Sequence, residues 1–348
     1  MKNAWAIREI TEEVVKTSKQ LGVENIIHYG GPGQIDYDLS SNSFEEYKNI
    51  VDTLKSHDLN LIGFEGGFLG NPQYWDLVTG GPKRDEKIEE LITQIRDMAR
   101  AGIPVFGYHW MPLGPLRTEP IKIRGDASGT AFNHESKNVS IAGTKELIQQ
   151  QQFEEFAKSN ILGSEQLEIL TPEFMWKNLE YWIKAITPVA EEEGIRLGIH
   201  PDDPPVNEVG GVPRILNSFD AFKRLVEIYP SDCNAIEFCQ GTFSEMNENI
   251  YEMIEYFVSR NKVLYVHFRN VSGPNPNKFH EEFINTGYVD MHKAMKIYKD
   301  AGYKGCFMDD HCPDIEGDKE FPGNLGGYRS RIFAQGYIQA MIQAVQGE

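Results

Sequence analysis

Basic residues and long hydrophobic runs are both scarce in this chain, and each shortage excludes a class of partner. The 348 residues include 34 Lys and Arg against 52 Asp and Glu, which gives a formal net charge of −18. A chain this acidic does not readily assemble the basic face that nucleic-acid binding requires, so we expect no nucleic-acid partner. No apolar run approaches the roughly 18 to 20 residues of a membrane span, and we therefore expect no membrane partner either.

Cysteines are also few, and the first residues do not resemble a signal peptide. Four Cys in a chain of this length do not make the disulfide framework of a small secreted protein. The first residues, Met-Lys-Asn-Ala-Trp, lack the apolar segment of a signal peptide. The composition is otherwise that of an ordinary globular protein, with 40% hydrophobic and 25% charged residues. These features predict a reducing, cytoplasmic location.

Short apolar runs alternate with amphipathic segments along the whole chain. Strands are expected at 4–7, 25–30, 59–64, 103–109, 195–200, 235–239, 262–269 and 305–310. Helices are expected at 8–22, after Ser43, and at 84–101, 145–158, 172–193, 218–228, 247–259, 290–301 and from 329. Eight strand–helix units predict an α/β protein with one closed (β/α)₈ TIM-barrel domain over 1–348. The competing fold, an open doubly wound sheet, is disfavoured because no glycine-rich dinucleotide fingerprint follows any strand.

A long insertion follows the fourth strand. Residues 111–145 are rich in Gly, Pro, Arg, Thr and Asp and show no clear period, and a helical region comes after them. A loop this long without regular structure is typically a lid or a binding loop.

Four consecutive predicted strands end in residues that can bind a metal. These residues are His200, Cys239, His267 and Asp310. Neighbouring barrel strands lie about 4.8 Å apart, so their carboxyl ends can converge on one ion. Imidazole, thiolate and carboxylate are all ligands for transition metals. One such residue alone is usually part of the core, but four at successive strand ends predict a metal site.

Further polar residues are expected around the same end of the barrel. Glu65, His109 and Arg269 end strands, and His280 lies in a later loop; we expect these four to contact the substrate. For Glu65 and His109 a purely structural role is equally compatible with the sequence. His311 follows the predicted ligand Asp310 directly, which suits a catalytic group.

Several segments resemble the mannonate dehydratase family. Residues 199–205 read Ile-His-Pro-Asp-Asp-Pro-Pro and are similar to that family's most specific signature. Similar segments follow in the same order: 238–242 (Phe-Cys-Gln-Gly-Thr), 266–271 (Val-His-Phe-Arg-Asn-Val), 279–281 (Phe-His-Glu) and 310–311 (Asp-His). A weaker similarity covers 108–112 and 117–118.

The resemblance implies a xylose-isomerase-like barrel and a divalent metal held by the four predicted ligands. The metal would be Mn²⁺, with Fe²⁺ or Zn²⁺ as alternatives that a thiolate ligand favours. It also implies dehydration of a small sugar acid, D-mannonate, to 2-keto-3-deoxy-D-gluconate in hexuronate breakdown. His311 and Tyr328 would then carry the acid–base steps, and the protein would form a homodimer.

The resemblance is weaker at the last strand. Met308, Asp309 and Pro313 stand where the family has Arg, Pro and His. An Arg-to-Met change removes a cation that could face a carboxylate. A metal-dependent isomerase or epimerase acting on a neutral sugar therefore remains an alternative, as does a non-catalytic metal- or sugar-binding protein.

Overall fold

The predicted barrel is confirmed by a computed structural model, which describes residues 1–30, 42–141, 146–161, 170–319 and 326–347. Eight parallel strands close into a barrel in the order β1-β18-β15-β14-β11-β4-β3-β2. The barrel strands are β1 (Lys2–Ile7), β2 (Asn25–Tyr29), β3 (Asn60–Glu65), β4 (Val105–His109), β11 (Arg196–His200), β14 (Asn234–Cys239), β15 (Val263–His267) and β18 (Cys306–Met308). All eight were predicted from their apolar runs.

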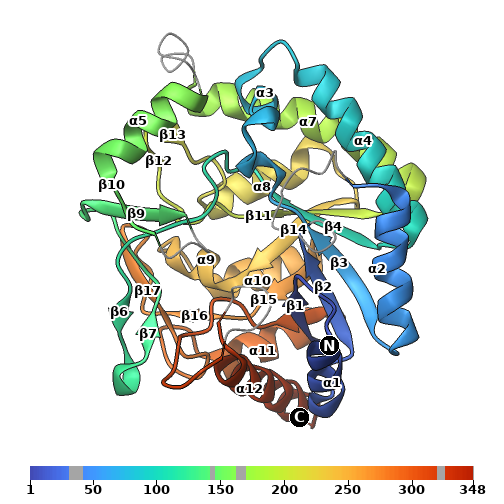
Figure 1. Ribbon diagram of the computed structural model, residues 1–348, viewed down its shortest axis with the longest axis vertical. Coiled ribbons are helices and arrows are strands. Elements are labelled where there is room, and N and C mark those ends of the chain that lie inside the picture. Colours follow the sequence, from blue (N-terminus) through green and yellow to red (C-terminus); the bar gives the residue numbers. More distant parts are fainter. Residues whose placement is uncertain (31–41, 142–145, 162–169, 320–325, 348) are drawn as a thin grey trace.

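A long helix returns the chain after each barrel strand, and these helices form the outer layer (Figure 1). They are α1 (Glu12–Leu21), α2 (Phe44–Ser56), α4 (Arg84–Ala101), α7 (Pro172–Glu193), α8 (Phe219–Ile228), α10 (Ile250–Ser259), α11 (Met291–Asp300) and α12 (Tyr328–Gly347). Local capping sets their ends. Ser43 forms a capping box with Glu46 at the start of α2, and Thr11 caps α1, which therefore begins later than its apolar pattern suggests.

The insertion after β4 is not a structureless loop in its described part, residues 111–141. It is built of short strands, because its backbone groups pair with one another and with a later loop. Its strands are β5 (Leu116–Arg117), β6 (Ile121–Lys122), β7 (Ser128–Gly129), β8 (Ala131–Asn133) and β9 (Asn138–Ile141). The short strands that follow it in the chain are β10 (Ile148–Gln149), β12 (Glu208–Val209), β13 (Val212–Pro213), β16 (Asn270–Val271) and β17 (Lys278–Glu282). The strand order β16-β17-β8 joins the insertion to the loop after β15. Residues 142–145 lie outside the described part.

Short helices complete the chain. They are η2 (Phe68–Gly70), η3 (Pro72–Tyr74), α3 (Asp76–Thr79), η4 (Arg124–Asp126), α5 (Gln150–Ile161) and α9 (Gln240–Glu245). The helix expected at 145–158 begins only at Gln150, because Ile148 and Gln149 pair with β9.

Three hydrophobic clusters of described residues adjoin the barrel wall. The largest lies between the strands and the outer helices, where Phe68 packs against Phe106 and Trp182. A second fills the barrel interior and includes Tyr29 and Tyr265. A third joins β1 to α1 and includes Trp5 and Val14.

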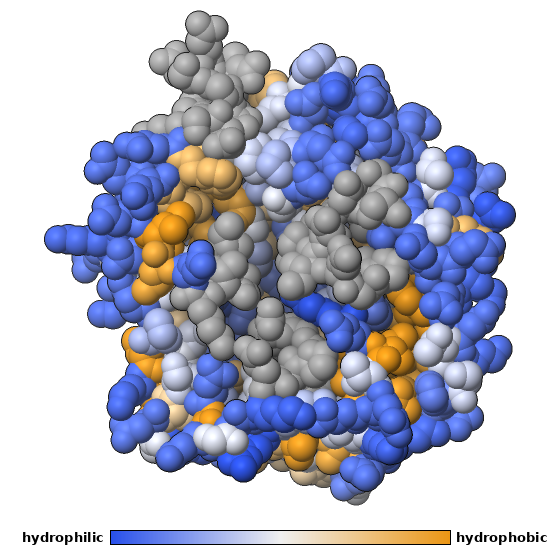
Figure 2. Space-filling view, in the orientation of Figure 1, coloured by the Kyte–Doolittle hydropathy of each residue, from blue (hydrophilic) through white to orange (hydrophobic). Residues whose placement is uncertain are grey.

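The surface agrees with the acidic composition. Hydrophilic residues prevail on the described part of the face in Figure 2. Within the described ranges no helix has the length and apolarity needed to cross a membrane. All four Cys are free.

Candidate metal centre

The carboxyl ends of β11, β14 and β15 bring three predicted ligands together. Ligand atoms of His200, Cys239 and His267 all lie within 4.8 Å of one another. Each is the last residue of its strand, and the parallel pairing of the three strands aligns these ends. The fourth residue, Asp310, follows β18 and places its Oδ2 3.5 Å from His267 Nδ1.

Polar contacts surround the two imidazoles. His200 Nδ1 lies 2.6 Å from the carbonyl oxygen of Pro201, so Nε2 is the ring nitrogen that can bind a metal together with the other candidate ligands. His267 is turned the other way: its Nε2 lies 2.9 Å from Glu237 Oε1, and its Nδ1 faces Asp310. Each ring thus has one nitrogen occupied by a protein acceptor and the other directed at its fellow ligands.

Cys239 has the charge state of a ligand. Burial alone would raise the pKa of its thiol, but Arg269, His200 and hydrogen bonds from His200 and His267 hold that pKa well below its usual value. Thr242 Oγ1 also donates to the sulfur at 3.3 Å. These neighbours favour the thiolate, the form that binds metals.

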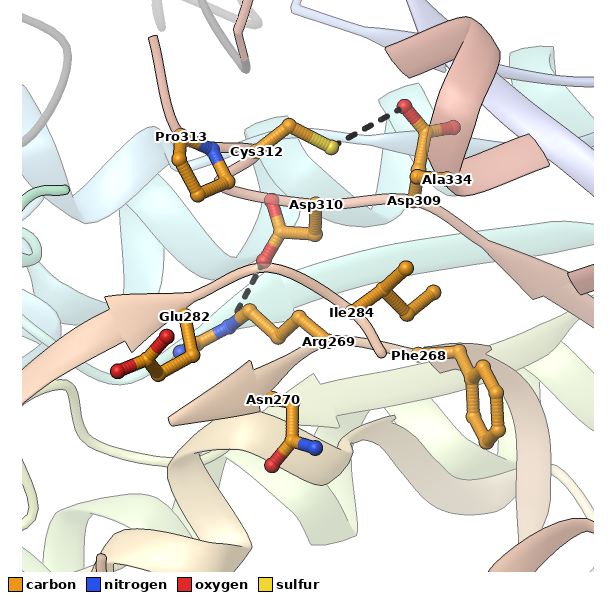
Figure 3. Close-up of a pocket in the computed structure, with 10 residues that line it drawn as sticks. All are labelled: Phe268, Arg269, Asn270, Glu282, Ile284, Asp309, Asp310, Cys312, Pro313 and Ala334. Atoms are coloured by element: carbon orange, nitrogen blue, oxygen red, sulfur yellow. Dashed lines mark hydrogen bonds and ion pairs between the residues drawn. The ribbon is translucent and has the colours of Figure 1, made fainter. Parts of the chain in front are cut away.

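Asp310 is ionised for a similar reason. Burial would raise the pKa of its carboxyl, but His311, His267 and Arg269 hold it well below the usual range. Arg269 Nε lies 3.2 Å from Asp310 Oδ2, and Figure 3 shows this contact between the ends of β15 and β18.

Arg269 belongs to a buried ionic cluster next to the ligands. Its Nη1 donates to Glu281 (2.7 Å) and Glu245 (3.2 Å), and its Nη2 donates to Thr242 (2.9 Å) and lies 3.2 Å from Asp203. Arg117, from the insertion, contacts Asp203 through both Nη atoms at 2.5 and 2.8 Å and reaches Glu281 at 3.2 Å. We name Arg117, Arg269, Asp203, Glu245 and Glu281 the arginine cluster. It ties the insertion to the metal-ligand end of the barrel.

Three further predicted residues lie beside the ligands. Glu65 Oε2 is 3.4 Å from His267 Nε2. His109 pairs with His200 in the strand register, and burial lowers the pKa of His109 to about 3, with His200 and Arg214 contributing. His311 Nε2 lies 3.7 Å from Asp310, and its backbone has a φ of 45°, a strained value for a residue other than glycine.

Two predicted site residues make contacts away from the ligands. His280 Nε2 contacts Glu282 at 3.1 Å on β17, while the next residue, Glu281, reaches the arginine cluster. Tyr328 begins α12 and packs against the hydrophobic cluster of β1 and α1, with Lys319 near its ring. The substrate role of His280 and the acid–base role of Tyr328 stay predictions.

Sequence reasoning missed several groups that the structure places here. Glu237 was hidden in an apolar strand, although a period of two puts it on the same face as Cys239. Asp203 was noted only as part of the signature at 199–205, and Glu281 only as part of the segment 279–281. The strand period could have revealed Glu237, but no local pattern predicts which Arg a loop carboxylate will contact.

The donor set fits a divalent transition metal. Two imidazole nitrogens and a thiolate converge, a carboxylate adjoins them, and the surrounding carboxylates and backbone oxygen orient the rings. Such mixed nitrogen, sulfur and oxygen sites are typical of Zn²⁺, Fe²⁺ or Mn²⁺ rather than Mg²⁺ or Ca²⁺.

Known proteins resemble this chain over most of its length. The family model described as D-mannonate dehydratase (UxuA) matches residues 10–348. A mannonate dehydratase of Streptococcus pneumoniae is 31% identical over 288 residues, which cover 78% of this chain and 76% of that protein. That of Thermotoga maritima is 30% identical over 319 residues, which cover 87% and 86%.

Solved structures agree. The crystal structure of mannonate dehydratase from Streptococcus suis serotype 2 superposes with a TM-score of 0.80 at 27% identity, covering 99% of this chain and 93% of that one. A xylose isomerase domain protein from Planctomyces limnophilus gives 0.58 at 11% identity, covering 100% and 99%, which shows the shared fold alone. With the match of the family model over nearly the whole sequence, these similarities show that the chain belongs to the D-mannonate dehydratase family.

Proposed function

We propose that this protein is a metal-dependent hydro-lyase that converts D-mannonate to 2-keto-3-deoxy-D-gluconate and water. The observation that carries the proposal is the convergence of His200, Cys239 and His267 at the carboxyl end of the barrel. This is the end at which TIM barrels place their active sites. Membership of the D-mannonate dehydratase family supplies the substrate.

The metal would be held by His200, Cys239, His267 and Asp310. We propose Mn²⁺, on the family resemblance. When bound, the ion supplies a Lewis acid that stabilises negative charge developing on the substrate carboxylate. Pro201 contacts the ring of His200, and Arg269 contacts the carboxylate of Asp310.

His311 is the residue proposed to move protons. In the reaction the C2–H bond breaks, the C3–O bond breaks with loss of the hydroxyl as water, and the resulting enol becomes the 2-keto acid. His311 lies beside Asp310 at the edge of the ligand group, so its imidazole is placed to take the C2 proton or to give one to the departing hydroxyl. Tyr328 and His280 stay predictions of the resemblance, and Glu65 and His109 are the polar side chains that adjoin the ligands.

The substrate test compares sugar acids with neutral sugars. Purified protein with added Mn²⁺ is incubated with D-mannonate, other aldonates, and neutral aldoses and ketoses, and 2-keto-3-deoxy acid is measured. We expect that product from D-mannonate only. A metal-loaded protein that yields none from any aldonate contradicts the proposal, and conversion of a neutral sugar would instead establish an isomerase or epimerase.

The metal test uses two cysteines at opposite ends of β14. Cys239→Ser removes the proposed thiolate ligand, and we expect it to lower both metal content, measured by elemental analysis, and activity. Cys233→Ser, just before the same strand, is the matched control and should retain both. Equal metal content in the two variants would remove Cys239 from the ligand set. Elemental analysis of protein purified without chelators also decides between Mn²⁺, Fe²⁺ and Zn²⁺.

The homodimer and the cytoplasmic location also stay predictions. Size-exclusion chromatography with light scattering tests the first, since a dimer has twice the 39.6 kDa mass of the chain.

A further inference from the structure

A buried carboxylate lies inside the barrel directly behind one proposed ligand. Glu237 is in the middle of β14, between Ile236 and Phe238, and its side chain is 0% exposed. Alternation along the strand puts it on the interior side with Cys239. Most TIM-barrel interiors are filled by branched apolar side chains, so an ionisable group at this position needs an explanation. Burying a carboxylate is costly unless it has a partner.

The partner of Glu237 is the ring of His267. Glu237 Oε1 lies 2.9 Å from His267 Nε2, which is shorter than the contacts of the ring with Glu65 (3.4 Å) and Asp310 (3.5 Å). The nitrogen on the other side of the ring, Nδ1, faces Asp310 at 3.5 Å. Glu237 therefore contacts the edge of the imidazole that points away from the other ligands.

The strand next but one, β4, leaves space for this carboxylate. A Cβ at Gly107 on β4 would lie 2.7 Å from Glu237 Oε2 and would also collide with the hydroxyl of Tyr265. Any larger residue at this position would push Glu237 away from the ring. The absence of a side chain at Gly107 and the presence of Glu237 are thus two parts of one arrangement.

Glu65 also approaches the ring but is placed differently. Its Oε2 lies 3.4 Å from His267 Nε2 and accepts a hydrogen bond from Tyr265 Oη at 3.1 Å. Its side chain is 21% exposed. The nearer, fully buried carboxylate is the better acceptor for the single proton on Nε2.

We infer that Glu237 is a positioning residue for the metal site: its carboxylate accepts the Nε2 proton of His267 and so directs the Nδ1 lone pair at the metal. The inference rests on the metal site of the proposed function and adds a residue that acts through a ligand. A carboxylate in this position fixes both the tautomer and the orientation of the ring and makes the ring a better donor. Loss of such a partner typically reduces metal affinity by about 10- to 100-fold.

The test measures metal affinity, so that it does not depend on turnover. The full-length apo protein competes with a fluorescent chelator for Mn²⁺ and, separately, for Co²⁺. We expect Glu237→Gln to lose about 10-fold in affinity, because the amide oxygen still accepts the proton but carries no charge, and Glu237→Ala to lose about 100-fold. Glu208→Gln, an exposed residue of β12, is the matched control and should bind as the wild type does. Circular dichroism checks that each variant is folded.

A spectroscopic readout separates positioning from a merely structural role. In ¹⁵N NMR of the protein loaded with diamagnetic Zn²⁺, His267 should carry its proton on Nε2, and this signal should weaken or change in Glu237→Ala. Wild-type affinity in both folded Glu237 variants would overturn the inference. A second ion per chain that is lost in Glu237→Gln would also overturn it, because Glu65, Glu237 and His267 would then be ligands themselves.

Failure of the proposed function would look different. If the wild type binds no metal, or if His200→Ala binds it as tightly as the wild type, the metal site itself is wrong. If the wild type binds metal, His200→Ala weakens binding and the Glu237 variants do not, only the present inference fails.

Discussion

The most demanding prediction concerns Arg269, for which the sequence and the structure suggest different roles. The sequence favours a substrate contact, since Arg269 follows a ligand at a strand end. In the structure its guanidinium is 3% exposed and surrounded by the carboxylates of Asp203, Glu245, Glu281 and Asp310 at 2.7 to 3.2 Å. Arg269→Met keeps much of the side-chain volume and removes the charge, so it tests which role dominates.

The expected cost is large because the carboxylates remain. Removing one partner of a buried ion pair typically costs about 3 to 5 kcal/mol, since the other charge stays buried without compensation. Against a usual stability of about 5 to 15 kcal/mol, this is a substantial part of the total. Arg269→Lys keeps the charge but cannot reproduce the planar fork of donors, so its loss should be intermediate.

Equilibrium urea unfolding, followed by circular dichroism, measures this cost. Arg96→Met is the control, because Arg96 pairs with Glu192 and Glu193 at 3.6 and 3.4 Å on the surface and should lose at most about 1 kcal/mol. If Arg269→Met is no less stable than Arg96→Met and its main defect is a raised KM for mannonate, then Arg269 is a substrate contact. The structural reasoning would then be refuted.

Three further outcomes are expected. Burial lowers the pKa of His28 from 6.5 to about 4; between these values only the unfolded state gains the proton, so stability should fall by about 1.4 kcal/mol per unit as pH drops. His28→Gln should reduce that slope in urea unfolding, and an unchanged slope would contradict the assignment. Asp309→Asn should lower stability by about 3 to 5 kcal/mol, because Arg331, also 0% exposed, loses its ion pair; an unchanged thermal midpoint would count against this. Removing the metal with a chelator should lower the thermal midpoint and re-addition should restore it, since an ion at 100 times its Kd stabilises by about 2.7 kcal/mol; no shift on removal would argue against a metal bound to the folded state.

The barrel could be predicted because its signals are local. Each strand is a short apolar run, each long helix has an apolar stripe, and eight such units in series leave few arrangements. The convergence of the candidate ligands could be predicted for a related reason. Parallel strands in a barrel place all their carboxyl ends on one rim, so His200, Cys239 and His267 had to lie near one another once the order of the strands was known.

The surroundings of the ligands could not be predicted in the same way. Arg117 lies 86 residues from Asp203 and 164 from Glu281 along the chain, yet it contacts both. Nothing in the local pattern of these segments indicates such pairings, because any Arg is chemically able to meet any carboxylate. The short strands of the insertion were missed for a similar reason. Strands of two residues have no measurable period, and their partners lie in other loops.

The residues at the last strand that depart from the family pattern lie in different surroundings. Asp309 points outward from the barrel and pairs with Arg331 and Gln335 of α12, so this change is explained by the helix behind it. Met308, one residue earlier, points inward. Its sulfur lies 4.0 Å from the Tyr29 hydroxyl, which is itself 3.5 Å from His267 Nε2.

An uncharged side chain therefore stands at the inner wall of the metal site where the family has a cation. Pro313 and Asp309 both line the small cavity drawn in Figure 3. Of the three departures, only Met308 has a described contact that leads to the ligand group. The Met308→Arg variant isolates the charge: if D-mannonate is the substrate, an added cation should leave product formation intact or improve it. If it instead creates mannonate turnover that the natural protein lacks, the natural substrate is an acid with different requirements or a neutral sugar.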